Sequence, residues 1–211
     1  MHRGSPEVGL RPADMMAPMS AALLEAPLLL IAMPQVMDPF FHRSLVLLVH
    51  HDAEGSLGFI VNRPTEILLG EILPGMEMEW AGTDDAVAYF GGPVQPQLGT
   101  VLYQRVDGSD GLEGTVEVTP DFRLTQHVSD LQSLAADPPG RFRLLLGYAG
   151  WGQDQLMEEI LRNDWLTATV EPDLVFTEDP LTAWEAALGS VGVDPGSLPS
   201  WSAPVDDGGS N

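Results

Sequence analysis

The chain has 211 residues, 44% of them apolar, and a formal net charge of −22 at pH 7. This apolar fraction excludes a wholly disordered chain, and the length suits one domain better than two. The chain has no cysteine, which excludes disulfide bonds, thiolate metal sites and a cysteine nucleophile.

The two ends of the chain differ in composition from its centre. Glycine, proline, methionine and other small residues fill the N-terminal end without any sustained period, and serine, proline, glycine and aspartate fill the C-terminal end. We therefore predict flexible tails at residues 1–22 and 199–211, on either side of one domain at residues 23–198. The apolar stretch Leu28–Met33 is too short for a secretory signal or a membrane span. We expect a cytoplasmic protein that does not bind membranes.

The first half of the domain is predicted to contain mainly strands. The strands are expected at Leu28–Ala32, Leu45–Val49, Gly58–Val61 and Val87–Phe90. The first two are nearly continuous apolar runs, which is typical of strands buried on both faces. Between the third and fourth strands, Thr65 is in position to cap a short helix that runs to Leu73.

The second half mixes strands and helices. Thr100–Val106 and Gly114–Val118 flank a stretch rich in glycine and aspartate, and we predict that they pair as a hairpin. Arg141–Leu146 is a predicted strand that ends in a turn at Gly147–Trp151, from which a helix extends to Asn163. Helices are also expected at Val128–Ala136 and Leu181–Leu188, and strands at Trp165–Val170 and Leu174–Phe176. Strands that come in runs, with irregularly placed helices, favour an α+β fold over a doubly wound sheet.

The acidic charge argues against binding to other polyanions. All nine basic residues are arginine, and nucleic-acid affinity depends on basic side chains that displace counterions from phosphates. Arg141 and Arg143 occupy alternate positions, which in a strand place both side chains on one face. Direct binding to nucleic acid or membrane is therefore not expected. An acidic chain with arginine in place of lysine also resembles salt-adapted proteins, although a GC-rich genome produces the same bias.

The sequence offers no recognisable metal site or catalytic set. His50 and His51 are adjacent at a strand end and so point to opposite faces, and no metal-ligand spacing is present. Ser44 and Ser56 have no obvious base. The turn at Gly147–Trp151 lacks the serine of a nucleophile elbow and the lysine of a phosphate-binding loop. We expect no metal and no cofactor, and the sequence favours a non-enzymatic protein while leaving an enzyme open.

Four segments, taken together and in order, resemble one family. They are Leu30–Pro34 with Met37-Asp38 and Phe41–Ser44, His51–Gly58 with Val61–Pro64, Gly91–Val94, and Gly147–Trp151 with Gln155-Leu156, Glu158-Glu159 and Trp165-Leu166. Over residues 23–198 the chain is similar to the YqgE/AlgH family of bacterial proteins. The resemblance implies a single compact α+β domain, with a mixed or antiparallel sheet folded into a pseudo-barrel and helices at its flanks. It also carries the label of a transcriptional regulator, without an assigned biochemical activity.

The sequence departs from the family pattern at three positions. The family usually has glycine where this chain has Asp154, glutamate where it has Met157, and histidine where it has Tyr103. A function carried by that glycine or histidine in relatives is therefore in doubt for this chain.

Two of the four segments supply candidate site residues near the middle of the chain. Asn62 and Arg63 follow a buried strand, where a guanidinium needs a carboxylate or a carbonyl as its partner. Arg63 therefore contacts either a bound anion or an internal acid such as Asp38 or Glu66. Gly91, Gly92 and Pro93 either form a glycine-dependent turn or allow a ligand to approach the backbone.

The last segment supplies the remaining candidates, Tyr148, Gly150 and Trp151. In the predicted strand-to-helix turn, the N–H groups of the helix N-terminus can receive an anion. However, Asp154 falls in the same turn and already supplies negative charge. The alternative is that the small residues let the two aromatic rings pack into the core.

Two functions remain open at this point. The first is a non-enzymatic binding or regulatory module that acts through a protein partner rather than through DNA. The alternative is a small-molecule or nucleotide-binding protein, with or without enzymatic activity, whose pocket is walled by the three candidate segments. The second function requires these segments, which are far apart in the sequence, to converge around one cavity. The sequence does not indicate the oligomeric state.

Overall fold

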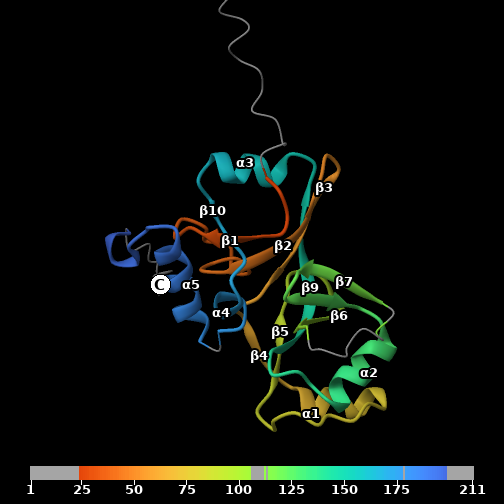
Figure 1. The fold of residues 1–211 in the computed structure, drawn as a ribbon. Coiled ribbons are helices and arrows are strands. Elements are labelled where there is room, and N and C mark those ends of the chain that lie inside the picture. Colours follow the sequence, from red (N-terminus) through yellow and green to blue (C-terminus); the bar gives the residue numbers. More distant parts are fainter. Residues whose placement is uncertain (1–23, 106–111, 113, 178, 199–211) are drawn as a thin grey trace, which may run out of the picture.

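The computed structural model describes residues 24–105, 112, 114–177 and 179–198 (Figure 1). The predicted tails at residues 1–22 and 199–211 lie outside the described residues. The strands are β1 (Leu28–Ala32), β2 (Leu45–His51), β3 (Gly55–Ile60), β4 (Pro64–Leu68), β5 (Val87–Phe90), β6 (Val94–Gln104), β7 (Thr115–Thr119), β8 (Phe122–Thr125), β9 (Phe142–Gly152) and β10 (Trp165–Ala168). The helices are α1 (Leu69–Ile72), α2 (Val128–Ala136), α3 (Gln155–Leu161), α4 (Pro172–Val175) and α5 (Pro180–Ser190), with 3-10 turns at Pro74–Met76 and Pro195–Ser197.

The strands form one curled, mixed sheet in which β9 holds the centre. The main path runs β10-β1-β2-β3-β9-β6-β8-β7, and β4 joins through β5. The last residues of β9 pair with β3 and the earlier ones with β6, both antiparallel, while β5 pairs with β9 in parallel. Figure 1 shows the resulting arrangement, with α3 at one end, α1 and α2 at the other, and α4 and α5 at the side. The predicted α+β fold, with helices flanking a curled sheet, is confirmed.

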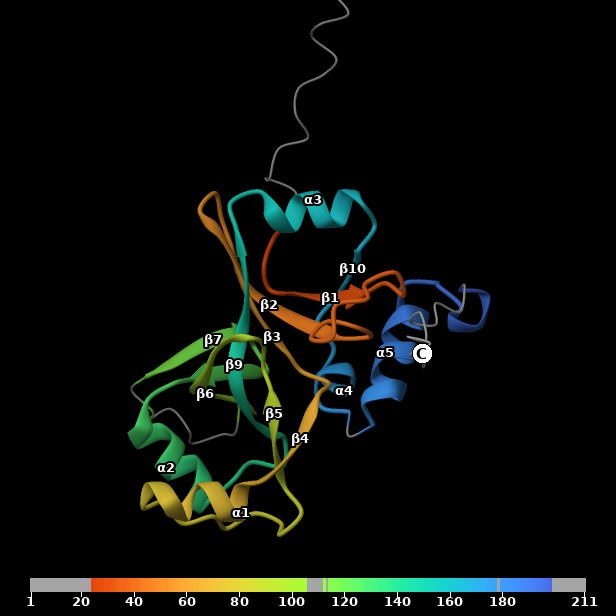
Figure 2. The same cartoon turned by 180° about the vertical axis from the view of Figure 1, so that it is seen from behind.

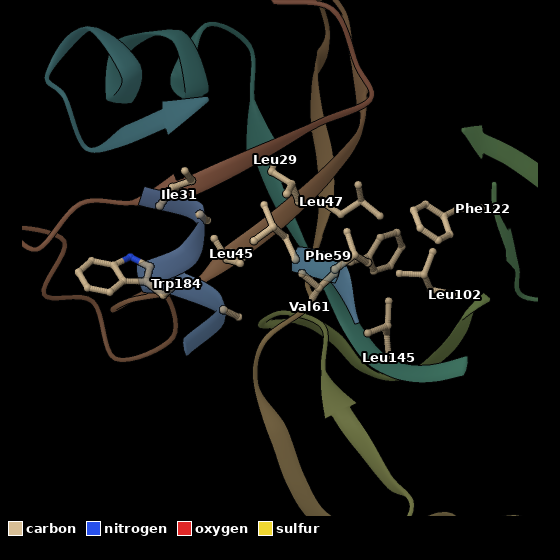
Figure 3. Close-up of a cluster of buried hydrophobic side chains, with 14 of the residues drawn as sticks. Leu29, Ile31, Leu45, Leu47, Phe59, Val61, Leu102, Phe122, Leu145 and Trp184 are labelled. Carbon is tan, nitrogen blue, oxygen red and sulfur yellow. The ribbon is translucent and has the colours of Figure 1, made fainter. Parts of the chain in front are cut away.

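The apolar runs of β1 and β2 are buried on both faces of the sheet. Leu29 and Leu47 pack with Trp184 of α5 in one cluster (Figure 3), whereas Leu30 and Leu48 pack with residues of α3 on the opposite face. Side chains alternate between the two faces of a strand, so covering both faces requires a run without polar interruptions. This explains why these two segments are readable from the sequence.

A second core lies at the end of the molecule that holds α1 and α2. Leu131 and Leu134 of α2 pack against Val101 of β6 and Leu144 of β9, and Leu73 joins from the segment after α1. Because β9 contributes neighbouring residues to this cluster and to the one under α5, it ties the two ends of the molecule together.

Two segments have a different secondary structure from the one predicted. The expected helix from Thr65 to Leu73 is wrong for its first part, because Pro64–Leu68 pairs with β5 and the Thr65 hydroxyl donates to the carbonyl of Ala88. The expected strand at Leu174–Phe176 is also wrong, because α4 begins at Pro172 and includes Leu174. Proline at the first helical position is set in a helical φ, which favours this outcome.

The predicted hairpin has different partners in the structure. The strand expected at Thr100 begins at Val94, and it pairs with β8 and β9 rather than with β7. The strand β8, which was not predicted, lies between β6 and β7. Strand β8 has only four residues, so its pattern is too short to stand out in the sequence.

The predicted turn at Gly147–Trp151 is a continuation of strand β9. The strand runs to Gly152, and α3 begins only at Gln155. Residues Gly150 and Trp151 pair with Leu57 and Ser56 of β3, which holds this segment extended. No helix N-terminus is therefore present at Gly147–Trp151 to receive an anion.

Candidate functional site

An open cleft of about 1130 Å³ lies between the α1–α2 end of the molecule and α4. Figure 2 shows β4 and β5 between these two parts. The cleft is walled by four segments: the start of β4 with α1, the stretch before β5 with β5 itself, the connection from α2 into β9, and α4 with the residues after it. Its lining includes Trp80, Asp85, Tyr89, Asp137, Gly140, Arg141, Phe142, Arg143, Asp173 and Phe176.

Arg143 anchors one wall of the cleft. Its side chain is buried, with the residue only 3% exposed. The guanidinium donates to the carbonyls of Val61, Val175 and Thr177 and lies 4.1 Å from the centre of the Tyr89 ring. A buried guanidinium needs several acceptors to offset its desolvation, and these carbonyls supply them. Arg143 thereby fixes α4 against the end of β3.

Arg141 directly precedes β9 and lines the cleft together with Phe142 and Arg143. The Arg141 guanidinium forms an ion pair with the carboxylate of Asp173 in α4, with an N–O distance of 2.5 Å. Asp173 is exposed, so solvent screens this pair and its contribution to stability is small. The pair neutralises a basic group at the edge of the cleft.

Four aromatic side chains line the cleft and remain partly accessible. Trp80 and Phe142 contact each other with ring centres 5.5 Å apart, and the ring centres of Tyr89 and Phe176 lie 4.1 Å and 5.5 Å from Cζ of Arg143. Burial of such rings supplies much of the energy in binding clefts and interfaces. The cleft thus offers apolar surface beside polar groups.

Two acidic side chains at the cleft have no partner within the described part of the chain. Asp85 and Asp137 are exposed, and neither carboxylate takes part in a hydrogen bond or ion pair with a described residue. They are therefore available to groups that enter from outside.

The three predicted site segments meet in the structure, but through backbone pairing. The Phe90 N–H donates to the carbonyl of Arg63, and the Gly91 N–H donates to the carbonyl of Leu146. A Cβ atom at Gly92 would lie 2.1 Å from the carbonyl carbon of Tyr148. The glycines therefore allow backbone to approach backbone, and none of Asn62, Arg63, Gly91, Gly92, Pro93, Tyr148, Gly150 and Trp151 lines the cleft.

Asn62 and Arg63 hold loops together. Asn62 is 5% exposed. Its side-chain oxygen accepts from the Leu45 N–H, and its amide donates to the carbonyls of Arg43 and Pro180. The Arg63 guanidinium donates to the carbonyls of Pro39 and His42. Burial lowers the pKa of Arg63, and the nearby negative charge of Asp38 acts in the opposite direction.

Trp151 belongs to a clasp at the other end of the molecule. One carboxylate oxygen of Glu159 in α3 accepts from the indole N–H of Trp151, at 2.9 Å, and from that of Trp165, at 2.8 Å. The other oxygen accepts from Gln155, at 2.9 Å. These hydrogen bonds fasten α3 to β9 and β10.

The structure gives Ser56 a histidine neighbour that its sequence position did not reveal. The expectation that Ser56 has no base within reach is wrong, because its hydroxyl lies 2.7 Å from Nδ1 of His51 across the β2–β3 hairpin. The other ring nitrogen, Nε2, is buried and has no hydrogen-bond partner. Neither residue lines the cleft. No group of three or more potential metal ligands occurs among the described residues.

Comparison with known proteins places the chain among sequence relatives that share most of its length. The AlgH-like family model matches residues 29–196. A UPF0301 protein of Myxococcus xanthus is 38% identical over 174 residues, which is 82% of this chain and 94% of the relative. A UPF0301 protein of Burkholderia multivorans is 40% identical over 172 residues, 80% of this chain and 89% of the relative.

Two solved structures share the fold. The solution structure of AlgH from Pseudomonas aeruginosa matches with a TM-score of 0.66 and 30% identity, over 89% of this chain and 97% of that one. A crystal structure of a Corynebacterium diphtheriae protein matches with a TM-score of 0.66 and 21% identity, over 78% of this chain and 87% of that one, and supports the fold alone. None of the described helices is both long and apolar enough to cross a membrane.

Proposed function

We propose the function from the site, because the chain belongs to the AlgH-like family and the names of its relatives state no activity. The chain is a non-enzymatic binding protein that holds a segment of a partner protein in the cleft. The observation that carries this proposal is the cleft itself. It combines four partly accessible aromatic rings with two carboxylates that have no partner among the described residues, and accessible rings of this kind are typical of interaction sites.

The proposal extends to regulation through protein contact in the cytoplasm. The regulator label attached to the resembling family motivates this role. A net charge of −22 disfavours direct contact with DNA. Electrophoretic shift of duplex DNA at low and high KCl tests this part, and specific retardation of a duplex would contradict it.

A pair of glycine variants tests the cleft directly. Gly140 lines the cleft and has open space where a side chain would begin, and Gly189 in α5 has the same open space away from it. Gly140→Trp therefore adds bulk to the cleft without disturbing the fold, while Gly189→Trp is the matched control. Both variants and the natural chain are tagged, and the proteins that copurify are identified, produced separately and titrated.

We expect a partner to bind the natural chain and Gly189→Trp with the same affinity, and Gly140→Trp at least about tenfold more weakly. Equal affinity for all three proteins would contradict a role for the cleft. Turnover of a metabolite by the purified chain would contradict the non-enzymatic part of the proposal.

A small molecule or nucleotide is the second candidate occupant. Its supporting observation is that the Tyr89 ring, Arg141 and Arg143 line the same cleft, because rings stack on bases and arginines pair with phosphates. The acidic groups at the cleft oppose an anion, so we rank this candidate second. Thermal-shift measurements with nucleotides on the Gly140→Trp and Gly189→Trp pair decide it: stabilisation that only Gly140→Trp abolishes would favour a nucleotide.

A further inference from the structure

If the cleft binds a protein segment, as proposed above, we further propose that this segment is cationic and places arginine or lysine side chains among the cleft's carboxylates and aromatic rings. The inference rests on the balance of charges that an incoming chain would meet. It concerns the chemistry of the partner, which the proposed function leaves open.

The basic groups of the cleft are already engaged. Arg143 is buried and donates to three backbone carbonyls, and Arg141 is paired with Asp173. The carboxylates of Asp85 and Asp137 have no partner among the described residues. The cleft lining therefore holds three carboxylates, of Asp85, Asp137 and Asp173, against two guanidinium groups, and this excess of negative charge favours a cation.

The chain segment beside the cleft strengthens this field. Between Glu77 and Asp85 the sequence has four exposed acids and no basic residue, and the second half of this stretch lines the cleft. Together with the net charge of −22, these groups attract a cationic segment during its approach and orient it on the cleft.

The aromatic rings suit the same partner. The molecule already stacks a guanidinium over a ring of this cleft, since Arg143 lies 4.1 Å from the centre of the Tyr89 ring. Trp80 is close to Asp85 in the sequence and also lines the cleft. Its ring is partly accessible, and tryptophan is the ring type that attracts cations most strongly. A cationic side chain of the partner can therefore contact the Trp80 ring and the Asp85 carboxylate, which are close together in the sequence.

The test uses three fluorescein-labelled twelve-residue peptides, with alternating Arg-Pro, Gln-Pro or Glu-Pro, and measures their binding to the full chain by fluorescence anisotropy. The variant Asp85→Asn/Asp137→Asn removes two charges from the cleft. The control Glu158→Gln/Glu185→Gln removes two charges from exposed sites on α3 and α5, away from the cleft. The Gly140→Trp and Gly189→Trp pair reports whether binding occurs in the cleft.

We expect the Arg-Pro peptide to bind more tightly than the other two, and the cleft double variant to weaken it roughly tenfold relative to the control. An equal loss in both double variants would show attraction by overall charge only and would overturn the inference. Equal binding of the Gln-Pro peptide, or displacement by spermidine at the same concentration as by unlabelled Arg-Pro peptide, would overturn it as well. If a copurifying partner still requires an open cleft in the Gly140 test but binds through an acidic or neutral segment, only the cationic inference fails.

Discussion

Asp154 shows how a departure from the family pattern is accommodated at a single residue. Its φ is +60°, a left-handed conformation that glycine adopts freely and other residues adopt at a cost. The family's usual glycine therefore matches the backbone at this position. Asp154 makes no side-chain capping bond to α3, so no hydrogen bond of its carboxylate to the helix offsets this cost.

We predict that Asp154→Gly raises the free energy of unfolding by about 0.5–1 kcal/mol, because it relieves the left-handed strain. Urea unfolding measures the change. The control is Asp154→Ala, which removes the same carboxylate but keeps the strain and is expected to give no gain. Stabilisation of both variants to the same degree would mean that charge, not backbone conformation, is the cause.

Tyr103 gives a pH dependence at the residue scale. Burial raises the pKa of Tyr103, with smaller effects from Thr115, Asp130 and Arg123, and the residue is 1% exposed. The unfolded chain therefore loses this proton first, near the ordinary pKa of about 10, while the folded chain retains it. Stability is fully present below that pH and falls as the pH rises through the folded-state pKa.

We predict that the melting temperature declines above about pH 10, and that Tyr103→Phe declines less steeply over the same range. Thermal unfolding between pH 8 and pH 11 measures both curves. The same alkaline decline in both proteins would assign it to other groups.

At the residue scale, the candidate site was only partly readable from the sequence. Arg141 and Arg143 both line the cleft, but so does Phe142 between them, so the lining does not test the predicted shared side of the two arginines. The aromatic residues Trp80 and Phe176 lie almost a hundred positions apart, and no local pattern links them. Only the fold brings them to one cleft, so the periodicity of the sequence could not predict that they share a site.

At the scale of elements, the carboxylate of Glu159 links α3 to two strands. Glu159 accepts hydrogen bonds from Trp151 of β9 and Trp165 of β10. These partly buried indole N–H groups would lose their acceptor if the carboxylate were removed, and an unpaired donor of this kind costs about 1–3 kcal/mol.

We predict that Glu159→Leu lowers the free energy of unfolding by about 2–4 kcal/mol and changes the tryptophan fluorescence. Glu158→Leu, at the neighbouring exposed position, is the control and is expected to be nearly neutral. Urea unfolding followed by fluorescence compares the two variants. Similar losses in both would mean that the clasp does not fasten α3.

Three elements were predicted with their observed bounds. Leu28–Ala32, Val87–Phe90 and Val128–Ala136 agree residue for residue with β1, β5 and α2. Two of the failures occurred where pairing with a distant strand decides the conformation. Pro64–Leu68 is extended because β5 lies beside it, and β9 continues through Gly147 because β3 and β6 pair with it.

At the scale of the whole molecule, the charge is the dominant feature. Each of the 22 excess negative charges repels the others, and salt reduces the range of this repulsion from about 10 Å at 0.1 M to about 3 Å at 1 M. A compact fold gains more from this screening than an expanded chain, because its charges lie closer together.

We predict that the melting temperature rises as KCl increases from 0.1 M to 2 M, with most of the rise below 1 M, where the Debye length changes most. Choline chloride over the same range is the control for ionic strength. A rise confined to KCl would indicate specific ion binding, and a flat or falling curve would contradict both self-repulsion and salt adaptation.

The cleft as the place where a partner binds is the central claim, and hydrogen exchange of the complex tests it most directly. The chain is exchanged alone and with the partner identified by copurification, and the protection of each segment is measured by mass spectrometry. The account predicts new protection at residues 79–89, 136–143 and 172–177, which wall the cleft, and none in α3. Protection confined to α3, or to the β7 edge of the sheet, would contradict it.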